Sequence, residues 1–134
     1  MKKLVFLLAL IITLASCSVG DDTDRNFTVL PVSTVDVPNK FKVDSISTFK
    51  IGYKRDNSCQ IFNGIYFNPT PDYIDVAIKI VELQESGCQP DDETMYEVPL
   101  YFKPEQSGTY MLKFWNGKDP NGQDQFTNTE IIVP

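Results

Sequence analysis

Apolar and polar residues alternate with a period of two along most of the chain after Phe27. The clearest example is the segment 74–80, where apolar residues at the even positions are separated by Asp75, Ala77 and Lys79. Because successive side chains of a strand point to opposite faces of a sheet, this pattern predicts strands with one buried face. No window of useful length shows the stripe of an amphipathic helix. The sequence therefore predicts an all-β domain.

The same alternation recurs often enough to indicate the type of β domain. It predicts further strands at 49–53, 96–102 and 110–114, and less regular β-rich segments occur at 27–37, 60–67 and 126–133. Turn residues separate these segments, among them Pro38-Asn39 and Ser86-Gly87. About seven strands joined in this way favour a single antiparallel β-sandwich over residues 27–134.

The N-terminus is organised differently. Lys2 and Lys3 precede an apolar run over residues 4–14, and small residues then lead to Cys17. An apolar run of about 11 residues is well short of the roughly 20 that a spanning helix needs. Residues 1–16 are therefore expected to be a secretory signal peptide that is removed. Cleavage by an ordinary signal peptidase, with Cys17 left as a free thiol, is the alternative.

The residues before the cleavage point carry a more specific signal. Leu14-Ala15-Ser16-Cys17 resembles the lipobox of bacterial lipoproteins, [LVI]-[ASTVI]-[GAS]-C, at every position. The resemblance implies that the Cys17 thiol receives a diacylglyceryl group and that a dedicated peptidase cuts after Ser16. Two or three acyl chains such as palmitate, at about 0.8 kcal/mol per buried methylene, would anchor the protein permanently to a membrane.

Residues 17–26 are expected to be the lipidated cysteine and an acidic tether. Serine after Cys17 resembles lipoproteins that are sent to the outer membrane. The acids Asp21, Asp22 and Asp24 resemble short tags that mark some lipoproteins for the outer surface. The expected location is therefore the outer membrane, with the periplasmic face and the cell surface both open.

Charge excludes one class of partner. Removing residues 1–16 leaves 118 residues, and it removes two of the 12 basic residues and none of the 18 acidic ones. The mature chain then has 10 basic and 18 acidic side chains, a net charge of −8. Because phosphate-rich partners are bound through clusters of Lys and Arg, we expect no nucleic-acid partner. A chain of this size forms one domain with a single core.

Cys59 and Cys88 are the cysteines that remain once Cys17 carries lipid. The cell envelope is oxidising, and two thiols allow a single pairing, so we expect one disulfide between them. Closing a loop of about 30 residues stabilises a fold by roughly 3–4 kcal/mol in the chain-entropy model. Two unpaired thiols are the alternative.

A local motif narrows the fold further. Residues 107–112 follow a proline-led turn and open a strand, and their Gly-x-Tyr run at Gly108 and Tyr110 resembles the tyrosine corner of immunoglobulin-like domains. The resemblance implies an immunoglobulin-like β-sandwich in which the Tyr110 hydroxyl bonds back to the backbone. Leu112 stands where antibody-type domains place a cysteine, so Cys59 and Cys88 must join other parts of the fold. An ordinary strand tyrosine is the alternative.

Catalytic functions have little support in the sequence. The chain has no histidine, which is the commonest general base and the usual partner of a nucleophile. It has no Gly-rich phosphate loop and no Gly-x-Ser-x-Gly motif. Eighteen acids on a small domain always include close pairs, which are better explained as solvated surface than as glycosidase carboxylates. We therefore expect a non-catalytic protein without a cofactor.

One loop has the composition of a weak calcium site. Asp119, Asn121 and Asp124 supply three oxygen-bearing side chains within six residues, which suits an extracellular ion. The loop lacks the spaced carboxylates and the terminal glutamate of an EF-hand. Asn121-Gly122 between two strands is also a common hairpin signal, so a turn without metal is the favoured interpretation.

Aromatic residues suggest a ligand platform. In the strand at 109–115, Trp115 points away from the face shared by Tyr110 and Phe114, and Tyr101 is on the corresponding side of the preceding strand. An exposed aromatic surface on a β-sandwich binds sugar rings by stacking against their C–H faces. Trp115 packed under a loop or against the second sheet is the alternative.

These observations predict a membrane-anchored envelope lipoprotein that acts as a protein-interaction or assembly module. The second hypothesis is a glycan-binding accessory lipoprotein that uses Trp115 and Tyr101, and an enzyme of unknown type is the third. The expected partners are the membrane, through the lipid, and an envelope protein or glycan.

Overall fold

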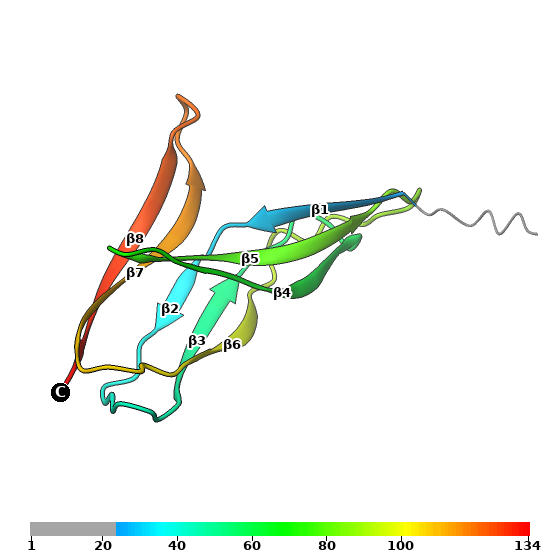
Figure 1. Ribbon diagram of the computed structural model, residues 1–134. Helices are drawn as coiled ribbons and strands as arrows, with labels where there is room; N and C mark the ends of the chain where they lie inside the picture. Colours follow the sequence, from blue (N-terminus) through cyan, green and yellow to red (C-terminus); the bar gives the residue numbers. More distant parts are fainter. Residues whose placement is uncertain (1–23) are drawn as a thin grey trace, which may run out of the picture.

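The computed structural model describes residues 24–134, and in that range the regular structure consists of strands. The predicted signal peptide, Cys17 and the tether up to Thr23 lie outside the described residues. Eight strands follow one another along the chain (Figure 1): β1 Arg25–Leu30, β2 Thr34–Asp36, β3 Ser47–Tyr53, β4 Gln60–Pro69, β5 Ile74–Leu83, β6 Tyr96–Phe102, β7 Gly108–Lys118 and β8 Asp124–Val133. The last two residues assigned to the tether, Arg25 and Asn26, are part of β1.

The strands predicted from alternation are confirmed. β6 has the expected bounds, and β3, β5 and β7 contain the segments 49–53, 74–80 and 110–114. β4 and β8 contain the less regular segments 60–67 and 126–133. The prediction of an all-β domain is therefore correct.

The strands form one sheet of five strands and one of three. β5 is the central strand of the five-stranded sheet: β4 pairs along one of its edges, and β1 and β7 share the other. β8 pairs with β7 and ends this sheet, while the three-stranded sheet has the order β2-β3-β6. Figure 1 shows β5 between β4 and β1, and the end of the β7–β8 hairpin extending beyond the other strands.

The sequence prediction of antiparallel pairing fails for one pair of strands. β5 and β7 run parallel where Ile74, Asp75 and Val76 lie beside residues 112–114. The connection between them passes through β6 in the other sheet, so β7 re-enters the five-stranded sheet in the direction of β5. Alternation specifies which face each residue occupies and leaves the direction of neighbouring strands open.

The segment 27–37 contains a crossing between the two sheets. β1 belongs to the five-stranded sheet and β2 to the three-stranded sheet, and Pro31, which has no N–H to donate to a ladder, lies in the chain between them. The Val32 N–H donates to the Trp115 carbonyl oxygen at 2.8 Å, and the Ser33 N–H donates to the Gly52 carbonyl oxygen at 2.8 Å. These two bonds attach the crossing chain to both sheets.

The core lies between the sheets. The four even-numbered residues of β5 from 74 to 80 are at most 7% exposed, and they belong to one cluster with residues of both sheets. The Phe49 ring of β3 lies 6.3 Å from Phe102 of β6 and 6.3 Å from Phe114 of β7, measured between ring centroids. Burying a large apolar side chain contributes about 1.5–3 kcal/mol, so this cluster holds the two sheets together.

The hydrogen bond expected of a tyrosine corner is present. The Tyr110 hydroxyl donates to the Gln106 carbonyl oxygen at 2.8 Å and accepts from the Gln106 N–H at 3.3 Å. Gly108 has a φ of +138°, a conformation that L side chains rarely adopt. The turn before β7 is thus closed by a side chain from the strand itself.

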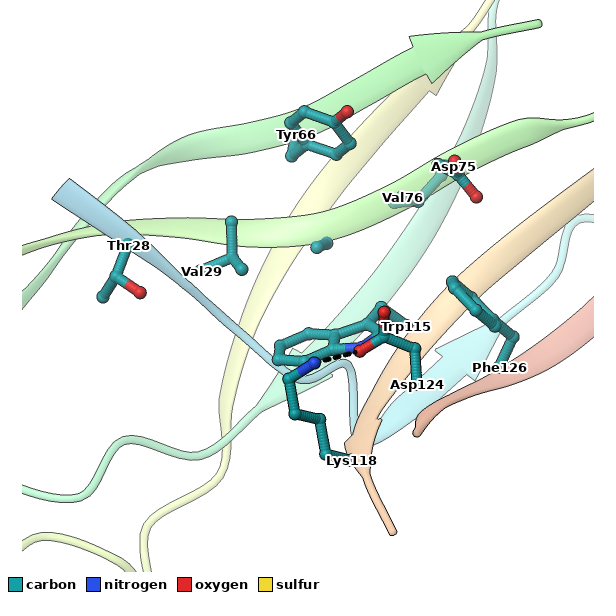
Figure 2. A pocket seen from close by; sticks show the side chains of 10 residues that line it. Thr28, Val29, Tyr66, Asp75, Val76, Trp115, Lys118, Asp124 and Phe126 are labelled. Atoms are coloured by element: carbon teal, nitrogen blue, oxygen red, sulfur yellow. Dashed lines mark hydrogen bonds and ion pairs between the residues drawn. The ribbon is translucent and has the colours of Figure 1, made fainter. Parts of the chain in front are cut away.

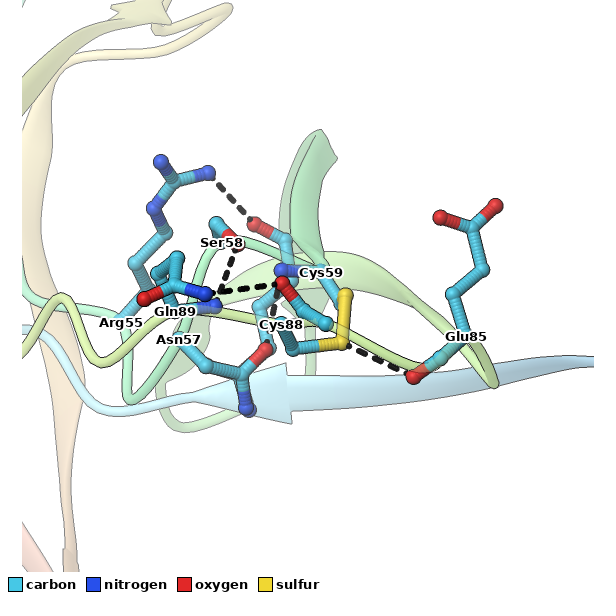
Figure 3. The surroundings of a disulfide bond; sticks show 9 residues. Arg55, Asn57, Ser58, Cys59, Glu85, Cys88 and Gln89 are labelled. Atoms are coloured by element: carbon cyan, nitrogen blue, oxygen red, sulfur yellow. Dashed lines mark hydrogen bonds between the residues drawn. A yellow bond between two sulfur atoms is a disulfide. The ribbon is translucent and has the colours of Figure 1, made fainter.

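The predicted disulfide joins Cys59 and Cys88, whose Cα atoms are 5.4 Å apart (Figure 3). It connects the residue before β4 with the loop between β5 and β6. The same loops are joined by backbone bonds, since the Ser58 N–H donates to the Gln89 carbonyl oxygen at 2.8 Å and Asn57 forms a β-bridge with Pro90. The disulfide therefore covalently links two loops that are already paired.

We expect the double substitution Cys59→Ala, Cys88→Ala to lower the free energy of unfolding by about 3–4 kcal/mol, because it frees a loop of about 30 residues in the unfolded chain. Urea denaturation of the purified protein, with and without reductant, measures this. Reductant should destabilise the wild type and leave the double variant unchanged. A loss below about 1 kcal/mol would show that the backbone pairing of the loops suffices without the disulfide.

Candidate functional site

The outer face of the five-stranded sheet, which points away from the core, is hollowed near its centre (Figure 2). The hollow has a volume of about 480 Å³, and residues of all five strands or their ends line it. We call it the outer hollow, and its lining residues are Thr28, Val29, Tyr66, Asp75, Val76, Ala77, Trp115, Lys118, Asp124 and Phe126. It thus combines aromatic rings with two acids and a lysine.

The floor of the outer hollow comes from β5. Val76 and Ile78 point into the core. Because side chains alternate along a strand, Asp75, which precedes Val76, and Ala77, which lies between Val76 and Ile78, point outward. Ala77 pairs with Tyr66 of β4 and is 4% exposed although it lies on the outer face. Its methyl group is much smaller than the side chains around it, and this difference in size produces the depression.

One wall comes from the β7–β8 hairpin. Trp115 and Phe126 are cross-strand partners, and both are half-buried. The pairing shifts between Trp115 and Gly117, where a β-bulge leaves Asn116 unmatched. Gly117 has a φ of +102°, and a Cβ there would lie 3.3 Å from the Pro31 ring. A glycine is therefore needed for β7 to approach the crossing chain beside the hollow.

One hydrogen bond orients the indole ring, and an ion pair supports its acceptor. Trp115 Nε1 donates to Asp124 Oδ1 at 3.1 Å, and Lys118 Nζ lies 2.9 Å from the same oxygen (Figure 2). The Lys118 ammonium, and next the indole N–H, lower the pKa of Asp124. Since this ion pair is largely exposed, it contributes little to stability, and its main effect is to orient Trp115.

The second acid of the outer hollow has no such partner. Asp75 Oδ1 is buried and receives no hydrogen bond from the part of the chain that the structure describes. Its neighbour in register on β7 is Lys113. The Lys113 Nζ lies over the rings of Tyr73 and Phe126, at 4.3 and 4.2 Å from their centroids. The Asp75 carboxylate is thus a hydrogen-bond acceptor with unused capacity inside an aromatic hollow.

The structure does not bring Trp115 and Tyr101 together. Trp115 belongs to the five-stranded sheet, while Tyr101 lies on β6 at the edge of the three-stranded sheet and is 65% exposed. Tyr101 lines a separate cavity with Phe67 and Pro104, among others. The expected common platform is absent because consecutive strands of the chain enter different sheets.

The residues of the weak calcium candidate are engaged in two different ways. Asp119 Oδ1 accepts hydrogen bonds from the N–H groups of Asn121 and Gln123, both at 2.9 Å, and so caps the hairpin turn. Asp124 instead faces Lys118 and Trp115. Within residues 24–134, no group of three or more Cys, Asp or Glu has an arrangement that could hold a metal ion. Asp119 therefore has the hydrogen bonds of a turn residue.

A charged cluster lies near the disulfide, at the junction of the two paired loops. Arg55 Nε donates to Asp91 Oδ2 at 2.6 Å, and the Tyr96 hydroxyl donates to the same oxygen. The Arg55 guanidinium also lies 4.9 Å from the centre of the Tyr96 ring. The Tyr96 hydroxyl, followed by Arg55, lowers the pKa of Asp91 to about 2. These groups satisfy one another and hold the loops together.

We expect Asp91 to make stability depend on acid pH. Its folded-state pKa of about 2 is below its ordinary value of 3.8. The stabilisation is therefore complete above about pH 5 and declines as the pH falls through 3.8 and then through about 2. Urea denaturation of wild type and Asp91→Asn should give a difference that shrinks over this interval. Asp92→Asn is the matched control, and equal pH dependence in wild type and Asp91→Asn would contradict the assignment.

Sequence reasoning missed Tyr66, Asp75, Ala77 and Phe126 as parts of a site. Alternation already placed Asp75 and Ala77 on the outward side of their strand. Alternation carried no information about which strand would pair with β5. It therefore could not predict that Tyr66 lines the outer hollow. The cross-strand contact between Trp115 and Phe126 could have been found by folding the hairpin around Asn121-Gly122.

No protein-family model, no curated protein and no solved structure matches this chain. Within residues 24–134, no helix is long and apolar enough to cross a membrane.

Proposed function

We propose that the protein is an outer-membrane lipoprotein whose immunoglobulin-like β-sandwich acts as a non-catalytic protein-interaction or assembly module. The partner is an envelope protein that adds an extended strand to β8. The observation that carries the proposal is the open edge of β8, which is ten residues long and pairs with β7 on one side. Unpaired N–H and C=O groups along such an edge are a template for an additional strand.

The other open edges in the described part of the chain carry features that discourage pairing. β4 has a shift in register between Phe62 and Ile65 and ends in proline, and β6 contains Pro99. β2 has three residues, and β1 has six and is followed by Pro31. β8 has no proline, glycine or lysine along its length, and its pairing irregularity lies on the β7 side. This contrast singles out β8 as the edge suited to strand addition.

Charge favours a different protein over a second copy. The chain has a net charge of −6 before processing, and the charged residues of β8 are Asp124 and Glu130. Two copies repel each other at long range, whereas a strand with lysine or arginine opposite Glu130 is attracted. The exposed apolar side chain of Ile132 adds a contact for an apolar residue of the partner.

The anchor and the fold support the same function. The resemblance of Leu14-Ala15-Ser16-Cys17 to a lipobox supports a location at a membrane, where an assembly role needs no catalytic machinery. The Tyr110 corner and the packing of two sheets support the immunoglobulin-like assignment. The lack of histidine supports a non-catalytic role.

The lipid anchor is tested with Cys17→Ser. We expect metabolically supplied palmitate to label the wild type, and we expect neither labelling nor membrane association in Cys17→Ser, because the thioether to the lipid cannot form. Membrane fractionation and labelling measure this. The double variant Cys17→Ser, Ser18→Cys has a cysteine one position later, and it should not regain labelling. Equal labelling of wild type and Cys17→Ser would contradict the lipoprotein assignment.

The β8 edge is tested by photo-crosslinking in intact envelopes. We expect a crosslinker at Asn128 of β8 to capture one protein, and a crosslinker at the exposed Thr48 of β3, a central strand, to capture none. Ile132→Lys should lower the Asn128 product about tenfold, or about 1.4 kcal/mol, because it places a lysine on the edge.

Ile46→Lys is the matched control, since Ile46 is 63% exposed, Ile132 is 66% exposed, and Ile46 lies outside β8. It should leave the crosslinked product unchanged. Equal capture from Thr48 and Asn128 would contradict the edge, and a product that contains two copies of this chain would contradict a separate partner.

A further inference from the structure

We propose that the outer hollow binds a neutral oligosaccharide, with Trp115 stacked against one sugar ring and Asp75 accepting a hydrogen bond from a sugar hydroxyl. This inference is independent of strand addition at β8, because the hollow opens on the face of the sheet and the partner pairs with its edge. It differs from the platform expected from the sequence, since Tyr101 has no part in it.

The shape of the hollow suits a ring-sized ligand. Its volume of about 480 Å³ falls within the roughly 300–1,000 Å³ typical of ligand sites. Ala77 forms the floor, and Tyr66 of β4 and Trp115 of β7 lie on either side of β5 (Figure 2). A sugar ring can therefore enter between aromatic side chains and rest on a methyl group.

The aromatic wall is held ready for stacking. The bond from Trp115 Nε1 to Asp124 Oδ1 fixes the indole, and the bond from the Val32 N–H to the Trp115 carbonyl oxygen fixes its backbone. Phe126 is directly opposite on β8. A ring fixed before binding loses little conformational freedom when a sugar C–H face packs against it.

The polar groups of the hollow match the donors and acceptors of a sugar. Asp75 Oδ1 lacks a donor, and Asp75 lines the hollow, so its carboxylate is the acceptor to which a ligand hydroxyl would donate. Lys118 supplies donors and Asp124 a second acceptor. Lys113 lies nearby, so the negative charges of the two acids are matched by the positive charges of two lysines. The site therefore favours a ligand that offers hydroxyls and has no net charge.

A second, smaller cavity indicates a chain of sugars. It has a volume of about 190 Å³ and shares Thr28, Val29 and Tyr66 with the outer hollow. Its remaining lining includes the polar side chains of Asn63 and Lys79, together with exposed Phe27. Because the two cavities adjoin along the outer face, they accommodate neighbouring units of one oligosaccharide.

The test is a titration of the full-length protein in a zwitterionic detergent that has no sugar headgroup. The probes are neutral hexasaccharides of α-linked glucose, β-linked glucose, mannose, galactose and N-acetylglucosamine, with hexagalacturonate as the acidic comparison. Trp115 is the single tryptophan, so its fluorescence reports on the site directly. We expect a saturable change with at least one neutral hexasaccharide and weaker binding of the matching monosaccharide.

Variants measured by calorimetry locate the site. Trp115→Ala removes the stacking wall, Asp75→Asn removes the charged acceptor, and Ala77→Leu fills the floor. Each should weaken binding at least about tenfold while the thermal midpoint shows that the protein is folded. The matched controls are Tyr101→Ala, an exposed aromatic residue on the other sheet, and Asp72→Asn, an exposed acid outside the hollow. Both should bind as the wild type does.

Three results would overturn the proposal: no saturable binding of any neutral hexasaccharide, binding of hexagalacturonate alone, or sugar binding that Trp115→Ala and Ala77→Leu leave unchanged. Ile132→Lys separates this site from the proposed protein partner. It should lower crosslinking at β8 about tenfold and leave sugar affinity as in the wild type.

Discussion

The fold depends on β5, which has strand partners on both edges and apolar contacts on both faces. β4 pairs with it along one edge, and β1 and β7 divide the other. Its even-numbered residues from 74 to 80 fill the core, while Ala77 is buried on the opposite face. Such a strand has backbone partners on both edges, so its register determines the position of the other strands of the sheet.

The two proposed functional surfaces follow from this arrangement. Since β1 and β7 meet end to end along β5, the wall at Trp115 stands beside Val29 and encloses the small side chain of Ala77. Since β7 uses its other edge for β8, the sheet ends in a long strand with one free edge. The outer hollow on the face of the sheet and the open edge of β8 can therefore bind different partners, a sugar and a protein strand, at the same time.

Local sequence patterns were enough to predict much of the fold. Alternation identified the faces of β5 and β6, the Gly-x-Tyr run identified the Tyr110 corner, and the count of cysteines identified the disulfide. The parallel pairing of β5 with β7 and the contact of Tyr66 with Ala77 could not be predicted, because both depend on which distant strands become neighbours. The separation of Trp115 from Tyr101 was hidden for the same reason.

Amide hydrogen exchange of the full-length protein in detergent tests the central role of β5 and the open edge of β8 most directly. We expect the slowest exchange of the sheet within β5 from Val76 to Ile80, because β4 pairs along one edge of this segment and β7 and β1 pair along most of the other. In β8 we expect slow and fast amides to alternate, because one edge of an antiparallel strand bonds every second residue. Uniform protection along β8 equal to that of β5 would contradict an open edge, and fast exchange within residues 76–80 would contradict a central β5.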